Sequence, residues 1–289
     1  MKNKYWAQLL AWLVALLMPT CFAAANKPAI IWGMNDWEPY FIVHGEDQRL
    51  GVGDLQIQAF IEQIKGFDHK VIFMPLRQFS TKAKSGQPLC FAGLLKSADR
   101  EKYLYFSKPN SILLTQQLIV STSLYQSLGS PKIISLTEFL NQTSRIGLLP
   151  QKRLFGQPID QILNKSSTNK AQFISANTKQ LLEIISSNRF GWTLEYPNFA
   201  SYVANKHNHA DKLKMIQLAE IEPFLLTYVG CSKSPFGKQA IAAINTAIAK
   251  LLPMAHYRHI AERWYPLQQR RQIRQYYNQY LLKPNTKTD

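Results

Sequence analysis

The alternation of short apolar runs with helix-like segments in the first third of the chain constrains the fold more than any other feature. The runs Ile30–Met34, Lys70–Pro75 and Leu89–Leu95 are too short for ordinary helices and lead into turns, which predicts strands. Between them, Leu55–Ile64 has apolar residues near helical spacing, and Gln78–Ser85 predicts a shorter helix. Strands and helices in this order indicate a parallel sheet with crossover helices, whose ligands bind beyond the carboxyl ends of the strands.

Residues 1–25 have the features of a secretory signal peptide. Lys2 and Lys4 give a positive start, Ala7–Leu17 is an apolar run too short to span a bilayer, and Ala23–Ala25 offers small residues for cleavage. No later apolar stretch approaches membrane-spanning length, so we expect a periplasmic protein that is soluble after export. A lipid anchor at Cys21 is the less favoured alternative, because the residues before it match such processing poorly.

The composition is strongly basic. The formal net charge of the 289 residues is +16, and it falls to +14 when Lys2 and Lys4 leave with the signal peptide. Positive charge favours weak attraction to anionic surfaces. No aromatic–basic nucleic-acid motif accompanies it, so we expect no nucleic-acid partner.

Hydrolytic and metal chemistry are poorly supported. The sequence has no Gly-x-Ser-x-Gly nucleophile motif and no zinc motif. The histidine pairs His207/His209 and His256/His259 have no cysteine or acid cluster beside them that would complete a metal site. We therefore expect neither a metal nor a cofactor.

The stretch Ser97–Pro109 follows the third strand and has the residues of an anion site. Ser97 is a good N-cap, and Arg100 lies three residues into the short helix that it predicts. Free backbone N–H groups at a helix start, together with the planar donor fork of an arginine, suit a carboxylate. The alternative is that Arg100 is a surface residue in a salt bridge with Asp99 or Glu101.

The order of a strand, Ser-x-x-Arg, an aromatic run and Phe-Ser-x-Pro resembles the core motif of bacterial extracellular solute-binding proteins of family 3. These are the periplasmic receptors for amino acids and similar small solutes. Ser97 stands where threonine is usual and Asp99 where glutamate is usual. The resemblance covers roughly Ile30–Pro266 and implies an α/β, two-lobed type 2 periplasmic binding fold. Each lobe is then a mostly parallel sheet with flanking helices, and the chain crosses twice between the lobes.

On this resemblance, residues 26–114 and 226–267 form the first lobe and residues 115–225 form the second. Residues 268–289 remain as a basic C-terminal extension. Its arginines Arg270, Arg271 and Arg274 are typical of a solvated helix face.

The resemblance also assigns ligand-binding candidates in the first lobe. In the family, the arginine that corresponds to Arg100 binds the α-carboxylate of the ligand, and Ser97 begins the same helix. An aromatic–Pro–aromatic segment lines the family's cleft, which makes Trp37 and Tyr40 candidates, since flat rings stack on solutes. Arg77, near the end of the second strand, is a further candidate, with a salt bridge as the alternative.

In the second lobe, a ligand-touching turn of the family corresponds to Lys152 and Arg153. A cation that faces the cleft there favours an anionic ligand, whereas one that faces solvent adds only to the basic surface. Amino-acid receptors of the family carry an acid after the strand Phe190–Tyr196 that pairs with the ligand's α-amino group. Glu195 or Tyr196 occupies that position, depending on a one-residue choice of register. With Tyr196 in the cleft, the usual amino-group partner is missing.

Two cysteines, Cys90 and Cys231, remain after cleavage, and export favours their oxidation. In the family, the two strands that carry them are antiparallel neighbours in the first lobe. The resemblance therefore implies a Cys90–Cys231 disulfide, with two buried free thiols as the alternative.

The resemblance implies a monomeric periplasmic solute-binding protein, not an enzyme, that serves transport or sensing. It would capture a small carboxylate-bearing solute, amino-acid-like or an organic anion, in an interlobe cleft. The expected partners are this small-molecule ligand and an inner-membrane transporter or sensor. The alternative is an exported, dehydratase-like lyase on the same fold that acts on a small carboxylic acid, with Glu195 or Glu38 as the cleft acid.

Overall fold

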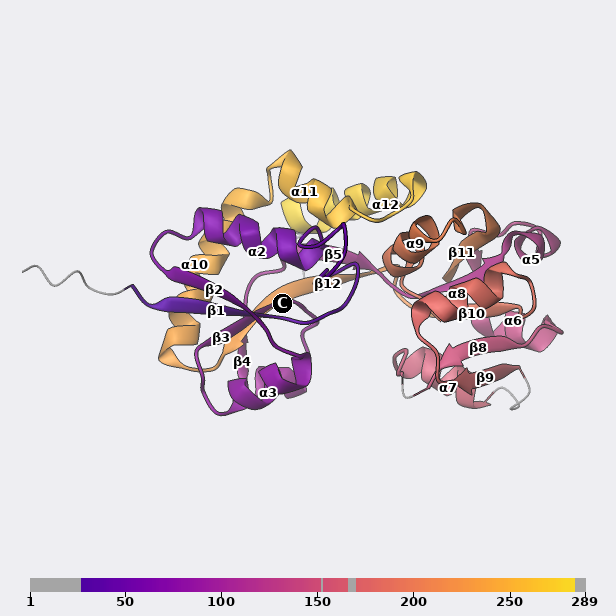
Figure 1. Cartoon of the computed structure of the whole chain (residues 1–289), viewed down its shortest axis with the longest axis horizontal. Helices are drawn as coiled ribbons and strands as arrows, with labels where there is room; N and C mark the ends of the chain where they lie inside the picture. The colour runs from indigo at the N-terminus through magenta and orange to yellow at the C-terminus, as the bar shows by residue number, and fades with distance from the viewer. Residues whose placement is uncertain (1–26, 152, 166–169, 284–289) are drawn as a thin grey trace, which may run out of the picture.

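The structure is a computed structural model that describes residues 27–151, 153–165 and 170–283. These residues form two lobes, each built on its own sheet, and extended strands join them (Figure 1). The predicted signal peptide and Lys152 lie outside the described residues. Within the described ranges, no helix combines the length and the apolar character needed to cross a membrane.

The sheet of the first lobe has the order β2-β1-β3-β12-β4, and β5 pairs with β12. β1 is parallel to β2 and β3, as the alternating strands and helices predict, whereas β12 is antiparallel to β3, β4 and β5. The strands are β1 (Ala29–Met34), β2 (Asp68–Phe73), β3 (Leu89–Leu94), β4 (Leu104–Phe106), β5 (Ser111–Leu114) and β12 (Phe224–Ser232).

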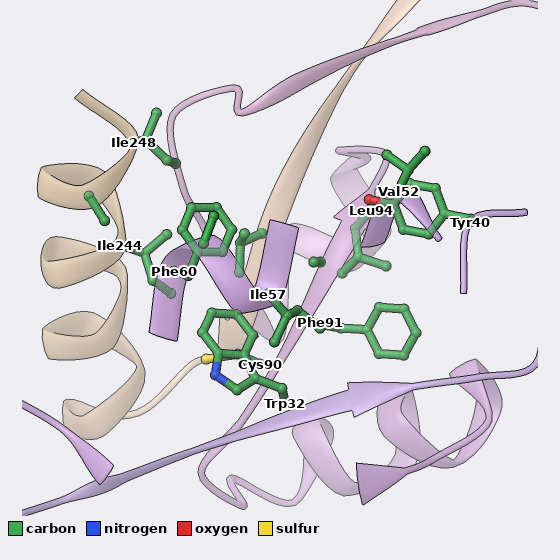
Figure 2. Packing of buried hydrophobic residues seen from close by; sticks show 14 of the residues in the cluster. Trp32, Tyr40, Val52, Ile57, Phe60, Cys90, Phe91, Leu94, Ile244 and Ile248 are labelled. Carbon is green, nitrogen blue, oxygen red and sulfur yellow. The ribbon is translucent and has the colours of Figure 1, made fainter. Parts of the chain in front are cut away.

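Helices cover both faces of this sheet (Figure 1). They are α2 (Val52–Gln63), α3 (Leu76–Lys84), α4 (Ala98–Glu101), α10 (Pro235–Leu251) and α11 (Ala255–Glu262). On one face, Ile244 and Ile248 of α10 point toward Phe60 of α2, whose ring stacks on Trp32 at 5.8 Å (Figure 2). On the other face, the ring of Phe91 lies 5.1 Å from that of Phe79 in α3. Both faces are therefore closed by apolar packing.

The sheet of the second lobe has the order β7-β11-β6-β10-β8-β9. Its strands are β6 (Gln117–Ser121), β7 (Ile133–Ile134), β8 (Gly147–Pro150), β9 (Ala171–Ile174), β10 (Trp192–Glu195) and β11 (Leu213–Leu218). Its helices are α5 (Thr122–Ser127), α6 (Leu136–Gln142), α7 (Gln157–Lys165), α8 (Thr178–Ser186), α9 (Pro197–Lys206) and the 3-10 turn Ala210–Lys212. Trp192 anchors one core against Phe139 of α6, and Ile119 anchors a second with Leu182 of α8.

The chain passes between the lobes twice, and the two crossings lie side by side. The first follows β5 into β6, and the second is β12. The pairs Ser111↔Thr227 and Leu114↔Phe224 place β5 and β12 antiparallel to each other. The two crossings between the lobes that the resemblance implied therefore lie at β5–β6 and at β12.

Cys90 of β3 and Cys231 of β12 are paired across the two antiparallel strands, with their Cα atoms 4.0 Å apart. A disulfide joins them, which confirms the predicted pairing. Both residues are fully buried, and Cys90 lies beside Trp32 (Figure 2). The bond fixes the returning strand β12 to the centre of the first sheet.

The C-terminal extension packs on the first lobe. It forms α12 (Leu267–Tyr277) and a π-helical turn (Asn278–Leu282), and Ile273, Tyr277 and Leu281 are buried in the core of that lobe. One face of α12 is therefore exposed, and the opposite face packs on the core of the first lobe.

The arginines of this helix differ in their contacts. Arg270, Arg271 and Arg274 are all exposed, as predicted. Arg274 also donates two hydrogen bonds to Glu262 of α11, and Nε of Arg270 donates to the Tyr265 carbonyl at 2.6 Å. The helix packs close enough to its own lobe for these two exposed arginines to make such contacts.

We expect Cys90→Ala/Cys231→Ala to lower the free energy of unfolding. The bond spans a sequence separation of 141 residues, and the chain-entropy model gives about 4–5 kcal/mol for so long a loop. Urea unfolding of the variant and of the oxidised wild type measures the difference. Thiol titration of the unfolded, non-reduced mature protein should detect no free thiol, and two reactive thiols would contradict the bond.

We expect Tyr277→Ala to lower the free energy of unfolding by about 3–5 kcal/mol, the cost of removing a buried aromatic ring. Tyr277 is fully buried, and its hydroxyl donates to the Leu252 carbonyl at 2.9 Å. Arg271→Ala in the same helix is the control, and it should stay within about 0.5 kcal/mol of wild type in the same denaturant titration. Equal stability of both variants would show that the extension does not hold the lobe.

Candidate functional site

The structure distributes the predicted ligand-binding residues over two cavities. The basic cavity, of about 640 Å³, lies on the first lobe, where β3 leads into α4. Its lining residues are Leu76, Arg77, Ser80, Lys84, Leu95, Ser97, Asp99, Arg100 and Tyr103. Arg77, Ser97 and Arg100, which were predicted to lie at the cleft between the lobes, line this first-lobe cavity. Lys84 also lines it and was missed from sequence, although its helical spacing from Arg77 and Ser80 could have shown it.

Arg100 sits at the strand-to-helix junction that the sequence predicts. Ser97 caps α4, and its hydroxyl accepts a hydrogen bond from the Arg100 backbone N–H at 3.4 Å. The guanidinium donates from Nη1 to the Leu95 carbonyl at 2.7 Å. This bond orients the side chain along the junction and leaves other N–H groups of the guanidinium for a ligand.

The acids that flank Arg100 are paired with lysines. Asp99 lies 3.2 Å from Lys102, and Glu101 lies 3.0 Å from Lys96. Within the described ranges, no carboxylate lies within 4 Å of the Arg100 guanidinium. The structure therefore does not contain the alternative salt bridge between Arg100 and Asp99 or Glu101.

The interlobe cavity, of about 400 Å³, is lined by both lobes. Its lining residues are Trp37, Glu38, Gln116, Arg153, Leu154, Thr178, Glu195, Tyr196 and Phe199. The rings of Trp37, from the first lobe, and Phe199, from the second, lie 5.0 Å apart. The cavity brings together Trp37, Arg153, Glu195 and Tyr196 of the predicted set.

Arg153 and Glu195 form a bidentate ion pair in this cavity. Nη1 and Nη2 of Arg153 donate to the two carboxylate oxygens of Glu195 at 2.7 and 2.6 Å. The Thr178 hydroxyl donates to Oε2 at 2.7 Å, and the Tyr196 backbone N–H donates to Oε1 at 2.8 Å. Glu195 is 3% exposed, so the pair is held largely away from water.

Burial and the charges of the pair together shift the pKa values of Arg153 and Tyr196. Burial lowers the pKa of the Arg153 guanidinium, but the hydrogen bonds and the charge of Glu195 outweigh burial and hold the pKa above its usual value. Burial raises the pKa of the Tyr196 hydroxyl, with Arg153 opposing and Glu195 adding to the rise. Arg153 is therefore a cation and Tyr196 a neutral phenol at any physiological pH.

Glu195 and Tyr196, which were alternatives for one position in the prediction, lie next to each other at the end of β10. Glu195 is the last residue of β10, and Tyr196 precedes α9, and both line the interlobe cavity. Thr178, Gln116 and Phe199 also line it and were missed from sequence. Thr178 begins α8 directly after its Asn177 cap, whose side chain accepts a hydrogen bond from the Gln180 N–H.

Tyr40 lines neither cavity. Its side chain is 5% exposed, and its hydroxyl donates to Gln56 at 2.9 Å. The ring lies against Gly93, where an added Cβ would come within 2.0 Å of the Tyr40 oxygen, and Gly93 has a φ of +78°. Tyr40 therefore packs the loop after β1 onto β3. Among the described residues, no three histidine, cysteine or acidic side chains are clustered as a metal site would require.

The sequence matches no family model and no curated protein. Solved structures nevertheless match the chain closely in fold. A histidine kinase sensor domain with similarity to periplasmic binding proteins aligns over 83% of this chain and 96% of its own, at 14% identity and a TM-score of 0.58. The second substrate-binding domain of a putative amino acid ABC transporter from Streptococcus pneumoniae aligns over 82% and 100%, at 14% identity and a TM-score of 0.59.

An ancestral cationic amino acid solute-binding protein aligns over 83% of this chain and 96% of its own, with 14% identity and a TM-score of 0.63. The chain has the type 2 periplasmic binding protein fold. The predicted fold class is thereby confirmed. In a chain of this fold with so little sequence identity to its neighbours, the ligand chemistry has to be derived from the cavity residues themselves.

We expect Arg153→Met to lower the free energy of unfolding by about 3 kcal/mol, because it leaves the buried Glu195 carboxylate without its cation. Arg153→Met/Glu195→Gln should recover most of the loss, since the second change removes the unpaired charge. Urea unfolding of both variants measures the effect. A single variant as stable as wild type would show that the ion pair does not hold the turn before α7 to β10.

Proposed function

We propose that this chain captures a small carboxylate-bearing solute in the cleft between its lobes and releases it chemically unchanged. The observation that carries the proposal is Arg100, placed at the start of α4 with guanidinium N–H groups uncommitted to any acid of the described chain. An arginine fork of this kind binds a carboxylate with two parallel hydrogen bonds. Ser97 and the first N–H groups of α4 complete the anion site.

The rest of the basic cavity supports the same ligand charge. Arg77 and Lys84 line it with Arg100, and within the described residues neither has a carboxylate within 4 Å. Asp99, the acid of the lining, is already paired with Lys102. The cavity therefore carries an excess of positive charge that an anionic solute would neutralise.

The second lobe would complete the site by closing over the solute. The fold is of the kind that closes by hinge motion, and β5 and β12 are the paired strands at the hinge. Trp37 and Leu154, at the rim of the interlobe cavity, are 42% and 83% exposed. Closure would cover these two apolar side chains, which gives the closed form a hydrophobic contribution.

Binding is a better reading than the lyase alternative. A lyase needs a carboxyl group free to exchange a proton with the substrate. Glu195 already accepts four hydrogen bonds, from Arg153, Thr178 and Tyr196, so its oxygens are not available for that role. Glu38, the other candidate acid, lines the same cavity, and one of its carboxylate oxygens lies 3.9 Å from Nζ of Lys206, so it too has a cationic partner.

We further propose a periplasmic, monomeric protein that hands its solute to an inner-membrane transporter or reports it to a sensor. The solved structures of similar fold include a domain of each kind, from an ABC transporter and from a histidine kinase. Mass spectrometry of the small molecules released from the natively purified protein identifies the solute. The identified solute is then added back to the protein. Recovery of a chemically changed molecule would contradict binding without chemistry.

We expect Arg100→Ala to leave the fold intact, because the side chain is partly exposed and packs no core. Binding of the identified solute should weaken by about 2–5 kcal/mol, the range for removing one partner of a desolvated charge pair. Arg100→Lys should restore the affinity only in part, because an ammonium group cannot reproduce the bidentate fork. Isothermal titration calorimetry measures all three proteins, with the exposed Arg271→Ala as the control. Wild-type affinity in Arg100→Ala would place the carboxylate elsewhere.

A further inference from the structure

We propose that the cleft between the lobes, with the basic cavity on one side and the interlobe cavity on the other, selects small dicarboxylates and rejects α-amino acids, because Arg153 occupies the carboxylate that could otherwise bind a ligand ammonium group. The inference rests on the proposed function and deepens it by naming the class of solute. One carboxylate would be held at Arg100 and the other at Arg153 when the lobes close.

The first step concerns the capacity of Glu195. An ionised carboxylate offers about four lone-pair positions. Two are taken by Arg153, one by the Thr178 hydroxyl and one by the Tyr196 backbone N–H. A ligand ammonium group could reach Glu195 only by displacing one of these donors, and the protein's own guanidinium is the strongest of them.

The second step concerns the donors that Arg153 retains. A guanidinium has five N–H groups, and the described contacts of Arg153 commit two of them to Glu195. The side chain is 25% exposed and lines the cavity. Its guanidinium lies 5.7 Å from the ring centroid of Tyr196 and 5.3 Å from that of Phe155. The remaining donors therefore lie on a side chain whose position is fixed, and they suit an acceptor such as a carboxylate.

The third step compares the acids and cations of the two cavities. The lining carboxylates Glu38, Asp99 and Glu195 each lie within 4 Å of a lysine or arginine. In the described chain, Arg77, Lys84 and Arg100 have no such partner. A solute with two negative charges and no ammonium group complements this distribution better than a zwitterion does.

The test uses dicarboxylates of matched length with and without an α-amino group. Calorimetry of the mature protein with succinate and aspartate, glutarate and glutamate, and adipate and 2-aminoadipate provides three such pairs. We expect at least one dicarboxylate to bind and its amino counterpart to bind at least tenfold more weakly. An amino acid that binds as tightly as its dicarboxylate, or a lack of binding by all six compounds, overturns the inference.

Variants of the ion pair test whether Arg153 causes the selection. Arg153→Met/Glu195→Gln removes the guanidinium without leaving a buried charge, and it should bind the dicarboxylate at least tenfold more weakly. Arg153→Met alone frees Glu195 and should shift the ratio of affinities toward the amino acid. Arg189→Met removes an exposed arginine of the same lobe that lines neither cavity, and it should leave the ratio unchanged. A ratio that is unchanged in both ion-pair variants, each checked for folding by circular dichroism, overturns the inference.

Arg100→Ala, titrated with the same compounds, separates this inference from the proposed function. Tight binding of an amino acid that is lost in Arg100→Ala would overturn the dicarboxylate inference and leave the proposed function standing. Binding of any compound that does not depend on Arg100 would contradict the proposed function itself. If none of the six compounds binds but the purified protein releases a carboxylate-bearing solute, the proposed function again stands alone.

Discussion

The pairing of β12 with β3 is the interaction on which the rest of the structure depends. β12 returns from the second lobe and pairs with β3, β4 and β5, so one strand joins β3 to β4 in the sheet and also forms one of the two crossings between the lobes. α4, which carries Arg100, lies between β3 and β4, and β12 holds both of these strands. The Cys90–Cys231 disulfide and the bond from the Ser107 N–H to the Val229 carbonyl secure the same alignment. The position of the proposed ligand arginine is thus set by a strand that is distant in sequence.

The two arginines proposed to bind the solute differ in their contacts, and burial explains the difference. Arg153 pairs with a glutamate that is 3% exposed, and such a carboxylate would be costly to leave without a cation. Arg100 lies where solvent reaches it, so it can keep unpaired N–H groups at little cost until a ligand arrives. Binding there exchanges water for a carboxylate. At Arg153, by contrast, a ligand can add to the existing pair but cannot replace Glu195 without leaving a buried charge.

Most of the fold could be predicted from the sequence, because its signals are local. The runs that became β1, β2 and β3 are apolar and bounded by turns, and the predicted runs overlap the strands of the structure. α9 and β11 were missed. α9 mixes small and polar residues with few large apolar ones, so its sequence shows no clear helical stripe. In β11, Leu213, Ile216 and Leu218 are buried, a spacing that does not follow the two-residue alternation of a half-buried strand.

The site was less predictable, because it depends on contacts that sequence spacing does not encode. Ser97 and Arg100 were identified because the cap and the donor fork lie within one short segment. The Arg153–Glu195 pair joins a turn to the end of a strand 42 residues later, and only the second sheet brings them together. Tyr40 has the residue type and the loop position of a ligand-stacking ring. Its burial is decided by Gly53 and Gly93, two glycines that leave room for the ring.

The net charge of the chain and the charge of its site act over different distances. The formal net charge of the 289 residues is +16, but at physiological salt a charge is screened within about 8 Å. The basic exterior can therefore raise the local concentration of anions and speed their approach, but it cannot choose among them. Choice requires charges at contact distance, where Arg77, Lys84 and Arg100 line one cavity and the neutralised Arg153–Glu195 pair lines the other. The proposed preference of the cleft for an anion therefore depends on these few side chains and their partners, and removing exposed basic residues elsewhere would change the rate of encounter more than the identity of the solute.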